Sequence, residues 1–169
     1  MEAVFRNLSR DDENKITDEH TFAEYELVIG NGYKLIECAR SIRYEVFTKE
    51  QNIATELDHD GLDEESLHVL VSNKEQAIAT ARLTVGMEQQ ASMTRVAVLK
   101  AHRSQGIATT VVSVLIEHAK TLNIASINIH AHNYLRQFYE KLGFRFIAEV
   151  EVVCGHQLIE MKINLCADS

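Results

Sequence analysis

The sequence has no proline and no tryptophan, and only seven of its 169 residues are glycine. Without proline, its turns must be built from Gly, Asn and Asp. No run of about 18 apolar residues is present, so we expect no membrane-spanning helix and no membrane partner. Residues 1–20 are polar and acidic and lack the apolar stretch of a signal peptide, which favours a cytoplasmic protein.

Cysteine is also scarce. Cys38, Cys154 and Cys166 are far apart, odd in number and without CxxC spacing, which predicts reduced thiols. The eight histidines are scattered, and the closely spaced pair His130 and His132 has no Cys or carboxylate at a metal-ligand spacing beside it. We therefore expect no metal site.

Basic residues are fewer than acidic ones: the sequence has 17 Lys and Arg and 25 Asp and Glu, which gives a formal net charge of −8. This balance excludes a general nucleic-acid-binding protein, which would carry a basic surface, although a local basic patch could still bind a phosphate. The length and the 46% hydrophobic content suit one globular domain. We expect a loose leader over residues 1–20 and one domain over residues 21–169.

Hydrophobic periodicity predicts a single mixed α/β domain. Alternation predicts strands at 22–30, 67–73, 76–86, 91–99 and 124–131, with a closing hairpin of 144–153 and 156–165 around Gly155. Helical spacing predicts helices at 34–51, 105–122 and 134–143, the last ended by Gly143.

A basic, polar patch lies where the predicted strand 91–99 leads into the predicted helix from Gln105. Lys100, His102 and Arg103 precede Gly106, which lets a ligand approach the backbone closely because it has no Cβ. A helix N-terminus also presents free N–H groups and a partial positive charge. The patch predicts a phosphate site, with an exposed loop at a helix start as the alternative.

The same residues resemble a known family. Arg103-Ser104-Gln105-Gly106-Ile107-Ala108 matches the Arg/Gln-x-x-Gly-x-Gly/Ala signature of the GNAT superfamily of N-acetyltransferases, and FYEKLGF (138–144) resembles a second family segment. The predicted element order also resembles this family over about residues 22–165. RYEVF (43–47) and His130-Ala131-His132, which is similar to an HAQ-like segment, resemble a small bacterial branch of the superfamily.

The resemblance implies a GNAT-like fold with a mostly antiparallel mixed sheet, flanking helices and a splayed central strand pair. It implies acetyl-CoA as cosubstrate and an amine on a small molecule or peptide as acceptor. A homodimer is possible through an edge strand or the C-terminal hairpin. Where the family often has asparagine seven residues before its tyrosine, this chain has His132, followed by Asn133. The implied cofactor-binding residues are Val96, Ala97, Val98, Arg103, Ser104, Gln105, Gly106, Ile107, Ala108, Thr109, His132 and Asn133.

Acetyl transfer from a thioester needs an acid for the leaving thiolate, a donor for the carbonyl oxygen and a neutral amine. By resemblance Tyr139 is the acid, and the alternative is an aromatic ring packed beside Phe138. A backbone N–H near Val98 is the expected oxyanion donor. Glu56 or Asp58 could take the amine proton, and His68 is a second candidate base with a structural alternative.

The acidic stretch 55–66 allows two interpretations. It is either a solvated face or the border of the acceptor site, where its charge would attract a cationic amine. Arg43 and Arg82 either orient this loop by ion pairing or lie on the surface.

Two other functions compete with the acetyltransferase. Arg43, Phe47, Glu56, Asp58 and Asp60 resemble part of the acyl-homoserine-lactone synthases, but those enzymes typically lack the RxxGxA loop and carry a tryptophan that is absent here. The domain could also bind acyl-CoA without turnover and act as a sensor. That function would need the Gly106 loop but not Tyr139.

Overall fold

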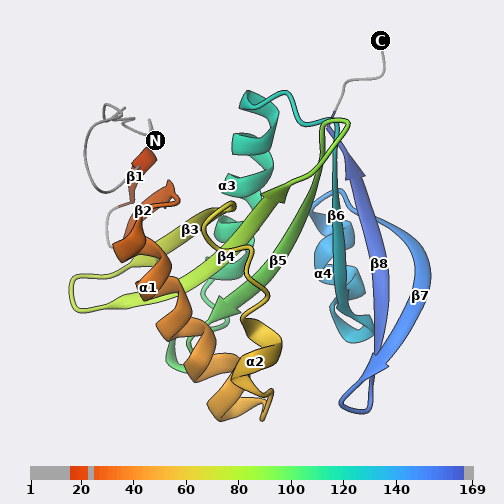
Figure 1. The fold of residues 1–169 in the computed structure, drawn as a ribbon, viewed down its shortest axis with the longest axis horizontal. Helices are drawn as coiled ribbons and strands as arrows, with labels where there is room; N and C mark the ends of the chain where they lie inside the picture. The colour runs from red at the N-terminus through yellow and green to blue at the C-terminus, as the bar shows by residue number, and fades with distance from the viewer. Residues whose placement is uncertain (1–15, 23–24, 166–169) are drawn as a thin grey trace. The chain divides into compact units, whose positions relative to one another are not determined.

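The computed structural model describes residues 16–22 and 25–165, which fold into a mixed α/β arrangement (Figure 1). The strands are β1 (Ile16–Phe22), β2 (Tyr25–Gly30), β3 (Leu67–Ser72), β4 (Ala77–Val85), β5 (Gln90–Val98), β6 (Ser126–His132), β7 (Arg145–Val153) and β8 (His156–Asn164). The helices are α1 (Tyr33–Arg43), α2 (Thr55–Asp58), α3 (Ile107–Thr121) and α4 (Arg136–Lys141). A π-helix η1 (Tyr44–Glu50) and two 3₁₀ turns, η2 (Lys100–His102) and η3 (Asn133–Leu135), complete the set.

The chain divides into two compact units. The first unit extends to Leu83 and resumes over Arg95–Val111, and the second comprises Thr84–Thr94 and the chain from Val112 onward. Strands β4 and β5 and helix α3 therefore each contribute residues to both units.

The first unit is built on the antiparallel strands β1-β2-β3-β4. Helix α1 lies across these strands (Figure 1) and packs against β3. It buries Leu35, Ile36, Ala39 and Ile42, a spacing that forms one helical stripe. Ile42 and Val46 then pack against Ala97 of β5, so that α1 and η1 are anchored to the end of that strand.

The second unit contains the strand order β5-β6-β8-β7. Ala91 of β5 pairs with Ile127 of β6 in parallel, and the pairs β6–β8 and β8–β7 are antiparallel. The alternate residues Ile127, Ile129 and Ala131 are buried, whereas His130 between them is exposed. The mixed, mostly antiparallel sheet with flanking helices is confirmed, while the splay of the central strands stays a prediction.

Glycine ends α4 as the sequence predicted. Gly143 has φ +97°, in the left-handed region. The N–H of Gly143 donates to the Glu140 carbonyl, and the N–H of Phe144 donates to the Tyr139 carbonyl. These two bonds form a Schellman cap, which satisfies carbonyls that the helix leaves open.

Three local expectations are wrong. Residues 16–20, expected within the leader, belong to β1, because they pair with β2; residues 1–15 lie outside the described residues. The expected helix 34–51 is α-helical only to Arg43 and continues as the π-helix η1. The expected loop 55–66 begins with the one-turn helix α2. Within the part of the chain that the structure describes, no helix is long and apolar enough to cross a membrane.

Candidate active site

The junction between β5 and α3 presents open backbone ahead of a helix N-terminus. Ser104 and Gly106 have φ +61° and +79°, and residues 103–106 are exposed. A Cβ added at Gly106 would meet no heavy atom within 4 Å, so the space beside it is open. The first N–H groups of α3 have no partner within the helix. This geometry suits an anion.

The strand that leads to this junction is held by packing and by one backbone bond. Ala97 and Val98 are 3% and 8% exposed, and Val96 is half-buried. The N–H of Leu99 donates to the Ile78 carbonyl of β4 at 2.9 Å. Beyond the loop, Ile107 is buried and Thr109 is exposed. The first unit thus contains both stretches predicted to bind one ligand: the end of β5 (96–98) and the loop with the first turn of α3 (103–109).

Arg103 has a carboxylate partner that the sequence analysis did not foresee. Its Nη1 and Nη2 donate to the two carboxylate oxygens of Glu50 at 2.6 and 2.7 Å, and its Nε donates to the Val98 carbonyl at 3.0 Å. The hydrogen bond from Arg103 lowers the pKa of Glu50. The guanidinium fork of Arg103 therefore joins the end of η1 to the end of β5.

The acidic stretch 55–66 is a solvated face only in part: Glu56, Glu64 and Glu65 are exposed, whereas two of its aspartates are buried. Asp58 and Asp63 are 6% and 3% exposed. Both accept hydrogen bonds from Arg43, which is 1% exposed: its Nε lies 2.8 Å from the Asp58 carboxylate, and its Nη1 lies 2.8 Å from the Asp63 carboxylate. Arg43 thus orients the loop by ion pairing, as one of the two interpretations proposed.

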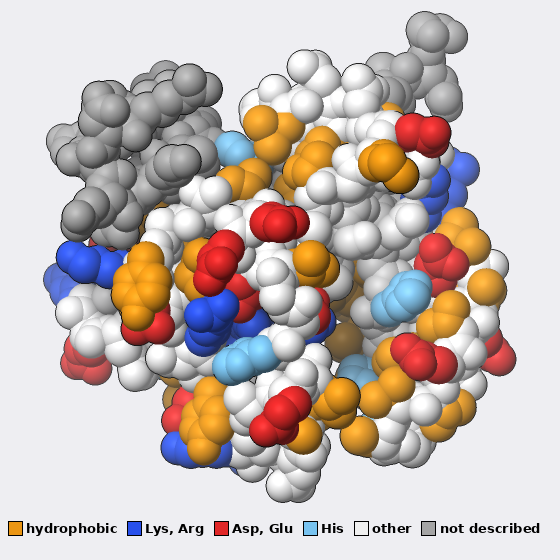
Figure 2. Space-filling view, viewed as in Figure 1, with side chains coloured by type: hydrophobic (Ala, Val, Ile, Leu, Met, Phe, Trp, Pro, Cys, Tyr) orange, Lys and Arg blue, Asp and Glu red, His pale blue; other side chains and the backbone are white. Residues whose placement is uncertain are grey.

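Three more arginines complete this ion-pair network. Arg82 of β4, 2% exposed, binds Asp60 at 2.5 Å and Asp63 at 2.9 Å. Arg40 of α1 donates to Asp63 at 2.8 Å. Arg95 of β5 lies 2.8 Å from the Asp58 carboxylate and 3.2 Å from that of Asp60. Figure 2 shows acidic and basic side chains next to one another on this face of the first unit.

The arginines determine the ionisation of the aspartates. Burial by itself raises the pKa of Asp63, but hydrogen bonds from Arg43, Arg40 and Arg82 outweigh burial and bring that pKa below its ordinary 3.8. The hydrogen bond from Arg82 lowers the pKa of Asp60 in the same direction. Both carboxylates therefore stay charged far into acid.

Arg95 has an unusual backbone. Its φ is +59°, a left-handed conformation inside a strand. For a residue other than glycine this conformation is strained, and it persists only where the surroundings hold it. Arg95 is also the residue that links β5 to α2, because its Nη2 donates to the Leu57 and Asp58 carbonyls at 3.4 and 3.2 Å. The sequence carried no signal for this conformation.

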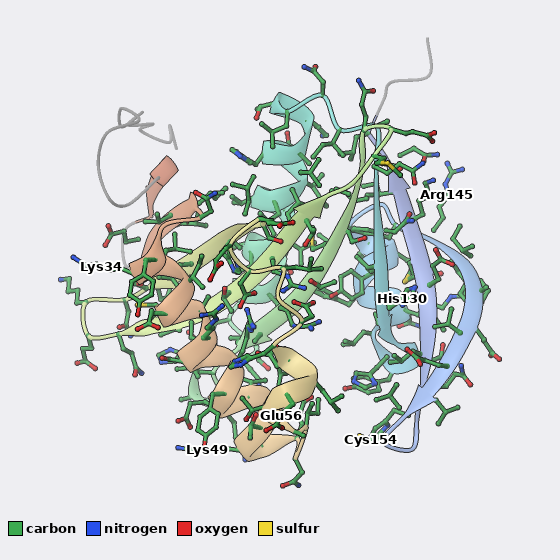
Figure 3. All side chains as sticks on the ribbon, viewed as in Figure 1. Lys34, Lys49, Glu56, His130, Arg145 and Cys154 are labelled. Carbon is green, nitrogen blue, oxygen red and sulfur yellow. The ribbon has the colours of Figure 1, made fainter. Side chains whose placement is uncertain are left out.

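Of the three candidate bases, Asp58 is buried and paired with Arg43 and Arg95, and the other two differ in exposure. Glu56 lies on α2, exposed to solvent (Figure 3). His68 is 0% exposed, and its Nε2 lies 2.8 Å from the Asp63 carbonyl. Burial lowers the pKa of His68, so this ring is neutral at neutral pH. The structural interpretation of His68 is therefore favoured.

Tyr139 lies in the second unit and is 5% exposed. Its ring meets those of Phe138 and Phe144 edge-on, with centroids 4.9 and 5.6 Å away. Burial raises the pKa of its hydroxyl to about 12. The hydroxyl therefore keeps its proton at neutral pH, which a proton donor requires.

His132 ends β6 in a cluster of rings. It stacks on Tyr134 at a centroid distance of 5.1 Å and meets His156 edge-on at 5.2 Å. Burial, with a smaller contribution from His156, lowers the pKa of His132. Asn133 follows it as an exposed residue. Among the described residues, no group of three or more His, Cys, Asp or Glu is arranged to hold a metal ion.

Residues 21–165 match the family model described as acetyltransferase (GNAT) domain. The chain is 31% identical over 124 residues to an uncharacterised N-acetyltransferase, YjcF, of Bacillus subtilis, covering 73% of this chain and 88% of that protein. The fold resembles Escherichia coli ElaA (TM-score 0.74, 23% identity, 83% and 98% covered). It also resembles an acyl-CoA N-acyltransferase from Pseudomonas aeruginosa (TM-score 0.69, 27% identity, 76% and 89% covered).

The ion-pair network predicts a loss of stability in acid. Asp60 and Asp63 bind protons less readily in the folded than in the unfolded chain, because their pKa values are lowered by the arginines. Their contribution is therefore present above pH 3.8 and is lost as the pH falls below it. His68, whose pKa is also lowered, adds a loss that begins below its ordinary 6.5. Urea unfolding over a pH series measures the loss of stability below pH 3.8 and the loss below pH 6.5.

Asp63→Asn should be less stable than the parent by about 3–5 kcal/mol at neutral pH, because it leaves buried arginines underpaired. Its stability should also depend less on pH below 3.8. Glu64→Gln, at an exposed position of the same loop, serves as the matched control. A parent stability that stays flat below pH 3.8 would contradict the ion-paired state of the aspartates.

Proposed function

The chain belongs to the acetyltransferase (GNAT) domain family, and we propose that it transfers acetyl from acetyl-CoA to a primary amine by direct attack on the thioester. The observation that carries this proposal is the open backbone at Gly106 in front of α3. The name of the Pseudomonas relative, an acyl-CoA N-acyltransferase, supports the same class of cosubstrate. We also propose that the protein is cytoplasmic and forms a homodimer. We further propose that it belongs to the small bacterial branch of the superfamily that RYEVF (43–47) and His130-Ala131-His132 resemble.

In this proposal the backbone binds most of the cofactor. The pyrophosphate lies against the N–H groups of the loop and first turn, Arg103, Ser104, Gln105, Gly106, Ile107, Ala108 and Thr109. The pantetheine arm pairs with the backbone of Val96, Ala97 and Val98. The buried side chains of Ala97 and Val98 support this assignment, since they are engaged in packing. His132 and Asn133 supply further contacts.

The proposed transfer forms a bond between the amine nitrogen and the thioester carbon and breaks the carbon–sulfur bond. The sulfur keeps the electron pair and takes a proton from the Tyr139 hydroxyl. A backbone N–H near Val98 donates to the carbonyl oxygen as negative charge develops on it. Glu56 takes the proton that the amine loses, directly or through water.

The acceptor is an amine on a small molecule or a peptide. Asp58, Asp60 and Asp63 are engaged with arginines, so they offer little free negative charge to a cationic acceptor. The exposed carboxylates of the same stretch, Glu56, Glu64 and Glu65, supply that attraction instead.

A non-catalytic acyl-CoA sensor is the alternative function. It would keep the Gly106 loop but would not need Tyr139. The acyl-homoserine-lactone-synthase reading is disfavoured by the match of residues 21–165 to the GNAT family model.

Gly106→Glu is expected to weaken CoA binding at least about tenfold, because a carboxylate would enter the space proposed for the pyrophosphate. Calorimetric titration with CoA measures the effect. Gly155→Glu is the matched control, since Gly155 also has a left-handed φ, +77°, and open space beside it. If Gly106→Glu binds CoA as tightly as the parent with its fold intact, the pyrophosphate site lies elsewhere.

Tyr139→Phe is expected to bind CoA normally and to lower kcat by about 10²–10⁴, the usual contribution of a general acid. The phenylalanine ring preserves the contacts with Phe138 and Phe144. Tyr134→Phe makes the same change at a 69% exposed ring and should leave kcat unaltered. Undiminished turnover by Tyr139→Phe would remove Tyr139 from the mechanism. If the parent protein binds CoA but acetylates no amine, the result would favour the non-catalytic sensor function.

Glu56→Gln is expected to reduce kcat and to flatten the acid limb of the pH–rate profile, because the amide cannot accept the amine proton. Glu75→Gln removes an exposed carboxylate from the turn between β3 and β4, outside the stretch proposed to attract the amine, and should keep the parent profile. The role of Glu56 as base is excluded if both variants show the parent profile.

A further inference from the structure

Two arginines flank the backbone proposed to bind acetyl-CoA, and both reach the same distant stretch of chain. Arg95 precedes Val96–Val98, and Arg103 follows. Their partners lie between Glu50 and Asp60, here called the 50–60 segment. This segment carries Glu56 on α2, at the end of the first unit where Lys49 also lies (Figure 3).

Arg103 holds the start of the segment. It binds both carboxylate oxygens of Glu50, at 2.6 and 2.7 Å, while its Nε donates to the Val98 carbonyl. A bidentate arginine–carboxylate pair fixes direction as well as distance. The last residue of η1 is thereby fixed to the last residue of β5.

Arg95 holds the other end of the segment. Its guanidinium lies 2.8 Å from the Asp58 carboxylate and 3.2 Å from that of Asp60, and it donates to the Asp58 carbonyl at 3.2 Å. The left-handed backbone at Arg95, φ +59°, is a strained conformation. The ion pairs around its side chain give a physical reason for that conformation to persist.

The 50–60 segment has little structure of its own to hold Glu56. Helix α2 is four residues long, far below the length at which an isolated helix is stable. The preceding η1 is a π-helix, a form that is rare and is frequently found at functional sites. The position of Glu56 therefore depends on what fastens the segment at its two ends.

We infer that Arg95 and Arg103 are positioning residues that clamp the 50–60 segment to the acetyl-CoA strand and so fix Glu56 for the acceptor amine. The inference rests on the proposed function. Residues 95–103 would then serve both substrates: the backbone of 96–98 for the cofactor, and the side chains of Arg95 and Arg103 for the acceptor.

Arg95→Asn tests one end of the clamp, because asparagine tolerates left-handed backbone but lacks the guanidinium. Glu50→Gln tests the other end and leaves Arg103 in place. In both variants we expect backbone amide hydrogen exchange in residues 50–60 to become about tenfold faster. We also expect the KM for the amine to rise about tenfold, equivalent to about 1.4 kcal/mol, with no loss of acetyl-CoA affinity.

Lys49→Gln is the matched control, because it removes an ion pair within η1, Lys49–Glu45 at 2.8 Å, that does not reach β5. It should leave exchange and KM unchanged. Arg95→Lys keeps the positive charge but lacks the forked guanidinium group. Its hydrogen-exchange rates and its KM for the amine should therefore lie between those of the parent and those of Arg95→Asn. It also serves as the test variant if Arg95→Asn does not fold.

Unchanged exchange and unchanged amine KM in Arg95→Asn would overturn the clamp, as would equal changes in Lys49→Gln. A parent that binds CoA but acetylates no amine contradicts the proposed function instead. In that case the hydrogen exchange of residues 50–60 still decides whether the clamp exists.

Discussion

The first unit depends on the pairing of the Asp63 carboxylate with three arginines. It accepts hydrogen bonds from Arg40 and Arg43 of α1 and from Arg82 of β4. Buried charges are tolerated only when they are paired, so these side chains have to come together for any of them to be buried. Asp63 thereby joins α1, β4 and its own loop at one point. The loop, which also carries Glu56, is held in one conformation.

This pairing changes the meaning of the chain's acidity. A sequence with a net charge of −8 and a run of acids at 55–66 suggests a broad negative surface. In the folded protein Asp58, Asp60 and Asp63 face four arginines, and the exposed glutamates of the same stretch are separate from them. The acids of one loop thus divide into structural aspartates and solvent-facing glutamates.

Strand β5 is the other organising feature, because its residues serve several purposes within a short distance. Ala97 packs against α1 and η1, Arg95 binds the α2 loop, and the chain then opens into the backbone around Gly106. Packing and ion pairs hold the side chains of this stretch, while the loop after it leaves room beside a helix N-terminus. Rigid support next to open backbone is what the proposed cofactor-binding element requires.

The sequence by itself determined the order of the main elements from β2 onward, the cap at Gly143, the Gly106 loop and the GNAT family, because periodicity, glycine placement and a short motif are local properties. It did not predict β1 or the short helix α2. It did not determine which aspartates are buried, the partnership of Arg103 with Glu50, the π-helix η1 or the left-handed backbone of Arg95. The arginine–aspartate pairs of the network and the Arg103–Glu50 pair join residues 15 to 53 positions apart. Only the tertiary structure could decide them, because two distant charges pair only when the fold brings them together, and a pair is buried only when the fold also excludes water.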